Sequence, residues 1–311
     1  MEKLEMQLLI DPKENIGKSV CATIGIFDGV HLGHKSIIDQ VKKEAAAKGL
    51  SSCVITFDPH PQQVLTGKKL PFITPFEKRV KLFEKENVDI AVCFTFDEKF
   101  SKITAEEFIS EKLVNTLNLK EIFIGHDFVF GKNRRGNSEL LKQMGKELGF
   151  ETTIIEPVTN GNDIISSTAI RNLILEGKIS RANKYLGRNY SLEGTVTEGE
   201  KRGRVLGFPT ANLKTNWDLL PKPGVYITLC HLSGKVHRSI TNIGFRPTFG
   251  KNSLLIESHL FNFSEEVYGT DIRIEFLSRL RDEKKFGGIE ELKEAISGDV
   301  RTANKYFDEN L

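Results

Sequence analysis

Short apolar, β-branched segments alternate with helical stretches through the first 185 residues of this 311-residue chain. Strands are predicted at 19–27, 52–57, 88–96, 121–125 and 151–158, and helices near 33–48, 75–86, 104–117 and 137–148. A strand, a helix and a second strand of one sheet need a right-handed crossover, which makes the strands parallel. The alternation therefore predicts a doubly wound, Rossmann-like α/β domain over residues 1–185.

The sequence changes after Tyr185, where strand-like segments are separated by Gly, Pro or Asn instead of by helices. Closely spaced strands joined by turns pair antiparallel, in a sheet or a small barrel. The last pattern, from Gly288 to Phe307, is that of an amphipathic helix, which Gly298 could interrupt. We therefore expect a second domain over residues 186–311, an antiparallel β-barrel followed by a C-terminal helix.

Charge and cysteine content exclude several classes of function. The chain has 44 Lys and Arg against 42 Asp and Glu, a net charge of +2, so neither a nucleic-acid nor a membrane partner is expected. Its four cysteines form no CxxC pair and three lie in predicted strands, as expected for buried reduced thiols of a cytoplasmic protein. No apolar stretch has the length of a signal peptide or of a membrane span.

The first long predicted strand runs into DGVHLGH, residues 28–34, which places His31 and His34 three residues apart where a helix begins. Free N–H groups and the positive end of the helix dipole favour anions there. Gly29 and Gly33 would let the backbone approach a ligand closely. The segment predicts a nucleotide-phosphate site, and the alternative is a pair of surface histidines at a helix cap.

A second segment, ISSTAIR at residues 165–171, predicts another helix start with Arg171 within its first turn or so. Hydroxyl groups, helix-terminal N–H groups and one guanidinium suit a polyphosphate. Alone, the segment would be an ordinary helix cap. Combined with His31-x-Gly33-His34, it indicates a nucleotide site built from two half-sites.

The second domain carries KRGRVLGFPTANL, residues 201–213, with a predicted Pro-Thr-Ala-Asn turn. The Thr210 hydroxyl and the Asn212 carbonyl are hard oxygen ligands of the kind that Mg²⁺ takes beside phosphate oxygens. The alternative is a strand connection with a basic face.

Glu257 lies on an apolar strand, on the face opposite to Ile256 and Ser258. On the pocket side it could accept a hydroxyl proton as general base; on the other side it is only solvated. Composition alone does not decide between these two roles for Glu257.

The HxGH and ISSTxIR motifs resemble the signatures of the nucleotidyltransferase superfamily. TFDPHP (56–61) and GHDFVFGKNRRGN (125–137) look like the flavin-side segments of bacterial FAD synthetases, although without that context they are an ordinary turn and an ordinary basic loop. GRVLGFPTANL, PKPGVYIT, NIGFRPTFG, IESHLFNF, VYG and RDEKKF follow in the order found in the riboflavin kinase domain. From about Gly17 to Phe307 the chain resembles the bifunctional prokaryotic riboflavin kinases/FMN adenylyltransferases.

One departure from the family pattern is Glu198, which stands where the family usually has His before the Gly. We expect this acidic residue to change ATP affinity rather than to abolish the chemistry.

The resemblance implies two ATP-dependent reactions with Mg²⁺ as cofactor: riboflavin to FMN in the C-terminal domain, and FMN to FAD plus pyrophosphate in the N-terminal domain. It implies that His31, His34 and Arg171 act in adenylyl transfer, that Glu257 is the base of the kinase, and that Thr210 and Asn212 hold Mg²⁺. The further binding residues expected for nucleotide and flavin are Gly25, Phe27, Asp28, Gly29, Gly33, Asp58, Asp127, Arg135, Ser166, Ser167, Thr168, Gly203, Gly207 and Pro209.

The expected partners are the small molecules riboflavin, FMN and ATP, and the protein is expected to be a monomer or a weak homo-oligomer. Two alternatives stay open. A single-activity nucleotidyltransferase on another phosphorylated small molecule would tolerate the loss of Thr210 and Glu257. A flavin-binding regulatory protein is the other, and the intact HxGH and ISSTxIR motifs argue against it.

Overall fold

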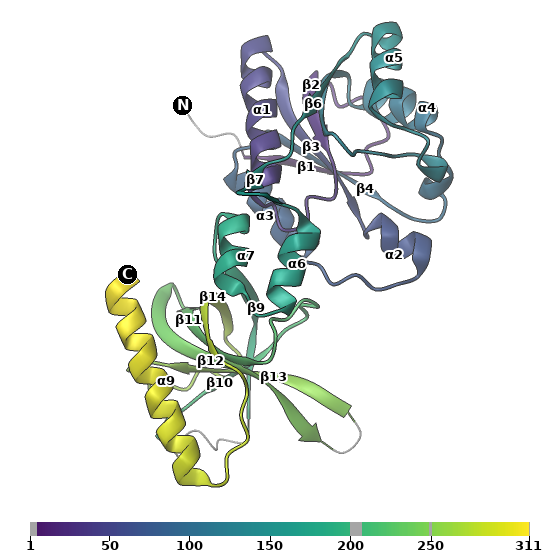
Figure 1. Cartoon of the computed structure of the whole chain (residues 1–311). Helices are drawn as coiled ribbons and strands as arrows, with labels where there is room; N and C mark the ends of the chain where they lie inside the picture. Colours follow the sequence, from purple (N-terminus) through teal and green to yellow (C-terminus); the bar gives the residue numbers. More distant parts are fainter. Residues whose placement is uncertain (1–4, 200–206, 249–250, 311) are drawn as a thin grey trace. The chain divides into compact units, whose positions relative to one another are not determined.

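The computed structural model describes residues 5–199, 207–248 and 251–310. Its chain forms two compact units, Met1–Ser167 and Thr168–Leu311 (Figure 1). Helices α6 (Ser167–Leu175) and α7 (Ile179–Leu186) thus fall almost wholly in the second unit, although they precede residue 186. The assignment of one activity to residues 1–185 and the other to residues 186–311 remains a prediction.

The first unit is built on a six-stranded sheet of order β1-β4-β3-β2-β5-β6, in which every neighbouring pair is parallel. The predicted doubly wound class is confirmed. The edge strand β1 has no counterpart among the predicted strands, because QLLI is short and mostly exposed. The strands are β1 (Gln7–Ile10), β2 (Val20–Ile24), β3 (Ser51–Asp58), β4 (Ile90–Thr95), β5 (Leu119–Gly125) and β6 (Glu151–Ile155).

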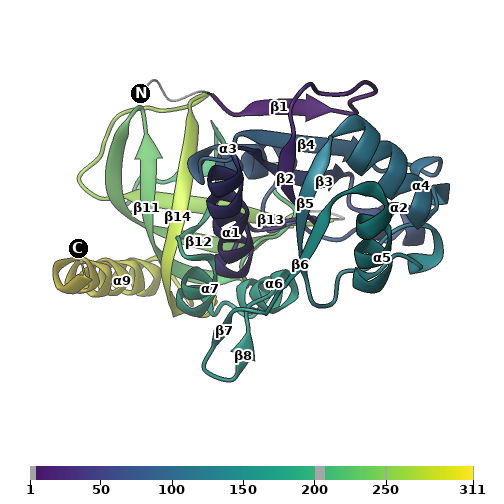
Figure 2. The ribbon, with the colours of Figure 1, turned by 90° about the horizontal axis from the view of Figure 1, so that it is seen from above.

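Helices cover both faces of this sheet (Figure 2). On one face, Ile38 of α1 (Leu32–Lys48) and Phe83 of α3 (Phe76–Lys85) pack with Val54 of β3. The other face is covered by a π-helix, η2 (Phe108–Thr116), and by α5 (Ser138–Leu148). The four predicted helices are confirmed, the third as the single turn α4 (Ala105–Glu107) continued by η2.

The end of α1 illustrates how local sequence determines a boundary. Gly49 adopts φ 65°, the left-handed conformation that glycine reaches without a Cβ clash, and its N–H donates to the Ala45 carbonyl. Smaller elements of the first unit are α2 (Pro61–Thr66), the 3₁₀ turns η1 (Phe100–Lys102) and η3 (Lys132–Arg134), and the hairpin of β7 (Thr159–Asn160) and β8 (Asp163–Ile164).

The second unit contains a closed antiparallel barrel of order β10-β13-β12-β11-β14-β9, which confirms the predicted barrel. One prediction is wrong: Ala211 and Asn212 are not part of a turn but begin a strand, because both neighbouring strands offer them partners. The strands are β9 (Tyr190–Thr197), β10 (Ala211–Lys214), β11 (Gly224–Leu232), β12 (Lys235–Thr248), β13 (Lys251–Leu260) and β14 (Asp271–Arg281).

A chain of hydroxyl groups lies inside this barrel. Thr228 Oγ1 is 2.8 Å from Ser239 Oγ and 2.8 Å from Thr241 Oγ1, and the Thr241 hydroxyl donates to Ser258 Oγ at 3.1 Å. All four side chains are completely buried. Buried polar groups are tolerated when they are hydrogen-bonded to one another, so this chain links three neighbouring strands in one register.

Helix α9 (Ile289–Asn310) runs along the outside of the barrel (Figure 1). Its Ala303 and Phe307 pack against Ile227 and Ile240. The interruption expected at Gly298 is wrong, since the helix is continuous there. A glycine costs an interior helix position only about 1 kcal/mol, and the next residue, Asp299, is held by a two-pronged ion pair with Arg281.

All four cysteines are buried free thiols, as predicted. Burial raises the pKa of the Cys21 and Cys93 thiols to about 12 and that of Cys230 to about 11, which disfavours their reactive thiolate forms. Among the described residues, no helix is both long enough and apolar enough to cross a membrane.

Asp299→Ala should lower the free energy of unfolding of the barrel unit by about 2 kcal/mol, because it leaves a partly buried guanidinium without its carboxylate. The matched control is Asp308→Ala, which removes the exposed pair between Arg238 and α9 and should cost less than about 1 kcal/mol. The single tryptophan, Trp217, lies in this unit, so urea unfolding followed by its fluorescence measures both variants. Equal losses would contradict the anchoring role of Asp299.

Candidate functional site

The connection from β2 to α1 lies at the switch point of the first unit's sheet. Strand β2 has β3 on one side and β5 on the other, so the order of the strands reverses its direction at β2. In open parallel sheets, ligands bind outside the carboxyl ends of the strands at such a point. The DGVHLGH segment occupies this place, between the end of β2 and the first turn of α1.

The two motif histidines are brought together at the helix start, as predicted. His31 is the N-cap residue, and its Nδ1 accepts a hydrogen bond from the His34 N–H at 3.4 Å. The two imidazole rings are stacked, with centroids 3.6 Å apart and planes inclined by 19°. The Phe27 ring meets His34 edge-on at 5.0 Å. Two imidazoles at the positive end of a helix favour an anionic group.

Gly33 lets the second motif approach the first. A Cβ at this position would lie 3.1 Å from two atoms of the His31 ring and 3.4 Å from the Ile165 carbonyl oxygen. Two residues further on, the Ser167 hydroxyl donates to the Asp28 carbonyl at 2.8 Å. Within the first unit, residues 165–167 of the ISST segment therefore adjoin the HxGH loop. Thr168 and Arg171 continue in α6 as part of the second unit, where Arg171 is buried.

Asp28 is engaged by the protein itself. Its buried carboxylate accepts hydrogen bonds from the backbone N–H groups of Ile73 and Thr74, at 3.1 and 3.0 Å. Phe27, Gly29 and Val30 have φ of 53°, 87° and 38°, a left-handed backbone that costs energy outside glycine. Asp28 thus stabilises an unusual backbone conformation. Before the loop, the Gly25 N–H donates a hydrogen bond to the Ile55 carbonyl.

The residues predicted for the flavin side lie after the neighbouring strands. Asp58 ends β3, and Asp127 and Arg135 follow β5 with exposed side chains. Burial raises the pKa of the Asp58 carboxyl, although the Arg79 guanidinium 3.1 Å away opposes that change.

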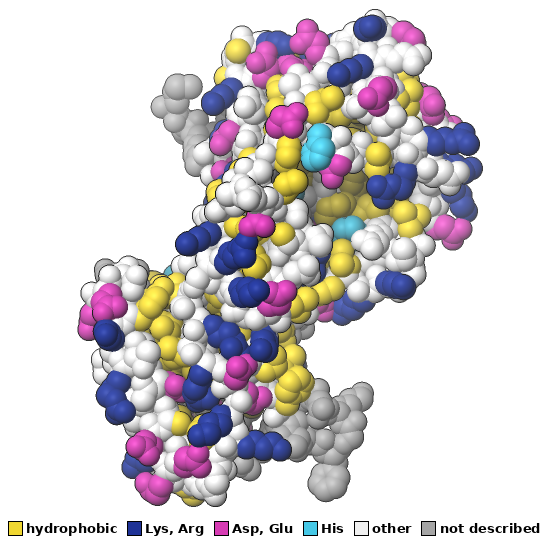
Figure 3. Space-filling view, in the orientation of Figure 1, with side chains coloured by type: hydrophobic (Ala, Val, Ile, Leu, Met, Phe, Trp, Pro, Cys, Tyr) yellow, Lys and Arg dark blue, Asp and Glu magenta, His cyan; other side chains and the backbone are white. Residues whose placement is uncertain are grey.

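A phenylalanine cluster that the motifs did not predict extends from the core of the sheet, where Phe57, Phe94 and Phe108 are buried, to partly buried rings near the same edge. Its neighbouring rings have centroids 5.3 to 6.4 Å apart. The available signal was the excess of 21 Phe over 5 Tyr in the composition. Figure 3 shows hydrophobic side chains gathered in a hollow of the first unit, with histidine beside it. The cluster comprises Phe57, Phe94, Phe96, Phe100, Phe108, Phe128 and Phe130.

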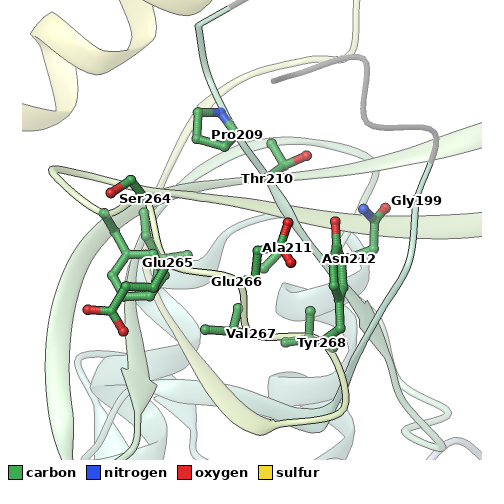
Figure 4. Close-up of a pocket in the computed structure, with 13 residues that line it drawn as sticks. Gly199, Pro209, Thr210, Ala211, Asn212, Ser264, Glu265, Glu266, Val267 and Tyr268 are labelled. Atoms are coloured by element: carbon green, nitrogen blue, oxygen red, sulfur yellow. The ribbon is translucent and has the colours of Figure 1, made fainter. Parts of the chain in front are cut away.

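In the second unit, a cavity of about 300 Å³ opens beside β10 (Figure 4). It is lined by Thr210 and Asn212 together with Glu265 and Glu266. Pro209 also lines the cavity, and Gly207, two residues before Pro209, has a left-handed φ of 84°. Hydroxyl, amide and carboxylate oxygens in one cavity form a donor set that suits Mg²⁺. Gly203 lies outside the described residues.

Gly199 lies directly against the Asn212 side chain, and the motifs did not predict it. A Cβ there would lie 2.2 Å from the Asn212 amide nitrogen and 2.8 Å from its amide carbon. A side chain at position 199 would therefore force the Asn212 amide to move. The signal in the sequence was the TEGE segment, in which this glycine directly follows Glu198.

Glu257 lies on the same barrel face as Asn212. The two residues are directly opposite each other on β13 and β10, and Asn242 of β12 is the other direct neighbour of Glu257. Directly opposed residues share a sheet face, whereas Ile256 and Ser258 point into the barrel. Glu257 is not among the residues that line the cavity, but it adjoins one that does.

His259 connects this strand to the loop before Thr210. Its Nδ1 is 2.9 Å from the Pro209 carbonyl oxygen, and the Phe208 ring packs edge-on against the imidazole at 5.4 Å. Burial lowers the pKa of His259, so the neutral imidazole is favoured. Strand β13 and the loop before Thr210 are therefore joined directly.

A doubly wound sheet with an HxGH helix start, joined to a barrel with an oxygen-lined cavity, defines a two-part nucleotide-dependent transferase. The FAD synthetase family model matches residues 13–169, and the riboflavin kinase model matches residues 186–307. The chain belongs to the family of bifunctional riboflavin kinases/FMN adenylyltransferases.

Relatives with that name are similar over nearly the whole chain. The one from Bacillus subtilis (strain 168) is 39% identical over 303 residues, 95% of this chain and 94% of the relative. The one from Listeria monocytogenes is 39% identical over 289 residues, 91% of each. A crystal structure titled macrolide-efflux protein, from Streptococcus pneumoniae, has a TM-score of 0.88 at 28% identity and covers 96% of this chain and 99% of its own.

These matches confirm the family predicted from the motifs. The protein is an enzyme of flavin cofactor synthesis with a riboflavin kinase and an FMN adenylyltransferase activity. Riboflavin, FMN, FAD and ATP are its substrates and products. A single-activity nucleotidyltransferase is not supported, since both family models match.

Gly199→Ala should lower kcat/KM for riboflavin phosphorylation about 10²-fold, because the added methyl group displaces the Asn212 amide. FAD formation from FMN and ATP should stay within about twofold of wild type. The control is Gly298→Ala on α9, where the nearest neighbouring atom is 3.8 Å away and both activities should persist. Unchanged kinase activity in folded Gly199→Ala protein would remove Asn212 from the site.

Proposed function

We propose that His31 and His34 stabilise the transition state of adenylyl transfer from ATP to FMN. An oxygen of the FMN phosphate forms a bond to the α-phosphorus while the bond to the pyrophosphate oxygen breaks. A phosphate dianion is already nucleophilic at pH 7, so this step needs no strong base. The observation that carries the proposal is the stacked imidazole pair at the start of α1, where ring and backbone N–H donors would meet the negative charge that develops.

The ISST segment would hold the β- and γ-phosphates. Ser166 and Thr168 bring hydroxyl groups to the start of α6, and Arg171 brings a guanidinium four residues after Ser167. The Ser167 hydroxyl donates to the Asp28 carbonyl, so the donor that Ser167 would offer to a phosphate is its backbone N–H. The roles of Thr168 and Arg171 rest on the motif.

The flavin would bind near Asp58, Asp127 and Arg135. The phenylalanine cluster at the same sheet edge supports this, because flat apolar rings favour aromatic neighbours. Asp58 and Arg135 offer opposite charges for the polar edge of the flavin or for its phosphate.

In the second unit, Glu257 would accept the proton of the ribityl 5′-hydroxyl as the hydroxyl oxygen bonds to the γ-phosphorus of ATP and the bond from that phosphorus to the ADP oxygen breaks. Thr210 and Asn212 would hold Mg²⁺, which neutralises phosphate charge when bound. Glu257 and Asn212 are paired on one barrel face, which supports a proton acceptor and a metal ligand acting at the same place. Gly207 and Pro209 shape the backbone just before Thr210.

The protein would work in the cytoplasm as a monomer or a weak homo-oligomer. Four buried free thiols support a reducing compartment. Adenylyl transfer would belong to residues 1–185 and phosphorylation to residues 186–311, in line with the segments that the two family models match.

His34→Ala should lower the rate of FAD formation at least about 100-fold while FMN formation persists, because one transition-state donor is lost. Glu257→Gln should do the reverse, with a loss of about 10²–10⁴-fold in riboflavin phosphorylation. Chromatography of riboflavin, FMN and FAD after incubation with ATP and Mg²⁺ measures both activities together. Parallel loss of the two activities in either folded variant would contradict the two-site assignment.

Thr210→Val should raise the Mg²⁺ concentration that gives half-maximal kinase activity by about tenfold or more, which corresponds to about 1.4 kcal/mol. The valine keeps the shape of threonine and removes its oxygen. Adenylylation of FMN by the same protein provides the internal control and should keep its wild-type Mg²⁺ dependence. A kinase Mg²⁺ curve identical to wild type would exclude Thr210 as a ligand.

A further inference from the structure

Arg79 is a fully buried charged residue beneath the adenylyl-transfer site. It lies on α3 with no exposed surface. Its Nη1 donates to the Ile26 carbonyl at 2.5 Å and to the Thr56 hydroxyl at 3.2 Å, and its Nη2 donates to Asp58 Oδ1 at 3.1 Å. One guanidinium thus connects the loop after β2 with the end of β3.

The surroundings keep this guanidinium in one place. The Phe72 and Phe76 rings have centroids 5.1 and 5.5 Å from its central carbon. The carboxylates of Asp28 and Asp58 both favour its charged form, which opposes the effect of burial. Because a buried charge is stable only with partners and fixed geometry, Arg79 depends on these groups as much as they depend on it.

The connected segments are those that carry the proposed chemistry. Ile26 begins the loop with left-handed Phe27, Gly29 and Val30, which ends at His31. Asp58 is tied to Arg79 through one oxygen, yet its side chain is 40% exposed, so the carboxylate faces solvent at the flavin-side segment. Arg79 therefore contacts Asp58 and the loop that leads to His31 at the same time.

We propose that Arg79 is a positioning residue for FMN adenylylation, which sets the His31–His34 loop and the Asp58 carboxylate at a fixed separation. The proposal rests on the proposed roles of these residues. Arg79 touches no reacting atom; it acts through the Ile26 carbonyl and through Asp58. A shift of about 1 Å between the two segments is enough to slow a reaction about 10²-fold.

The fork shape of the guanidinium matters more than its charge. Its two terminal nitrogens reach acceptors on two segments at the same time. A lysine ammonium is a single charged point on a flexible stem and cannot reproduce this geometry. Arg79→Lys therefore separates positioning from simple charge balance.

The experiment compares wild type with Arg79→Lys and Arg79→Met in the full chain, at a temperature where circular dichroism shows each variant folded. We expect kcat for FAD formation from FMN and ATP to fall about 10²-fold in both variants. Riboflavin phosphorylation should stay within twofold, because it is the activity assigned to the other unit. Folded Arg79→Lys protein with wild-type kcat and KM for FMN would overturn the proposal.

A matched control separates positioning from stability. Glu121 is also buried and charged, and it binds Lys48 at 2.7 Å near the opposite, amino-terminal ends of the strands. Glu121→Gln should lower the melting temperature but leave kcat for FAD formation within twofold. If Glu121→Gln reduces kcat as much as Arg79→Lys does, the loss is one of general stability and the proposal fails.

Two further variants test the route of action. Asp58→Asn combined with Arg79→Lys should slow FAD formation by less than the product of the two single effects, because the two residues share one contact while Arg79 also acts through the Ile26 carbonyl. Fully multiplicative effects would contradict action through Asp58. His34→Ala in the same assay tests the underlying assignment. If His34→Ala leaves FAD formation intact, the proposed site fails. If His34→Ala abolishes FAD formation while the Arg79 variants keep wild-type rates, only the positioning role of Arg79 is refuted.

Discussion

The backbone between β2 and α1 passes through three left-handed residues, and the first unit's site depends on this turn being held. Val30 is β-branched, and such residues rarely adopt positive φ, so the conformation persists only with support from outside the loop. Asp28 binds two backbone N–H groups, Ser167 donates to the loop, and Arg79 donates to its first carbonyl. Near-neutral net charge adds to this need, since phosphate affinity must come from local groups held in place.

The second unit positions its polar residues by close packing and strand register. Gly199 adjoins the Asn212 amide, and His259 binds the carbonyl that precedes Thr210. Pairing across β10, β13 and β12 sets Glu257 between two asparagines. Both units therefore use rigid strands to place groups at their surface, although one uses the ends of parallel strands and the other the wall of a barrel.

Periodicity and turn chemistry were sufficient to predict most of the architecture. The predicted strands and helices, the barrel, and the start of α1 at His31 follow from local patterns. Long-range contacts explain what could not be predicted. Asn212 belongs to a strand because β9 and β13 pair with it, and Gly298 stays helical because Asp299 is anchored by Arg281. Arg79 resembles a surface residue in the sequence, since arginine is seldom fully buried.

The hydroxyl chain inside the barrel limits where residues can be inserted or deleted in the second unit. Side chains alternate along a strand, so inserting one residue into β13 would exchange the places of Ser258 and Glu257. A carboxylate would then enter the interior, and the hydrogen bond from Thr241 would lose its acceptor. Insertions and deletions are therefore tolerable only in connections such as the Ser233–Gly234 turn, and the barrel strands form a frame of fixed length.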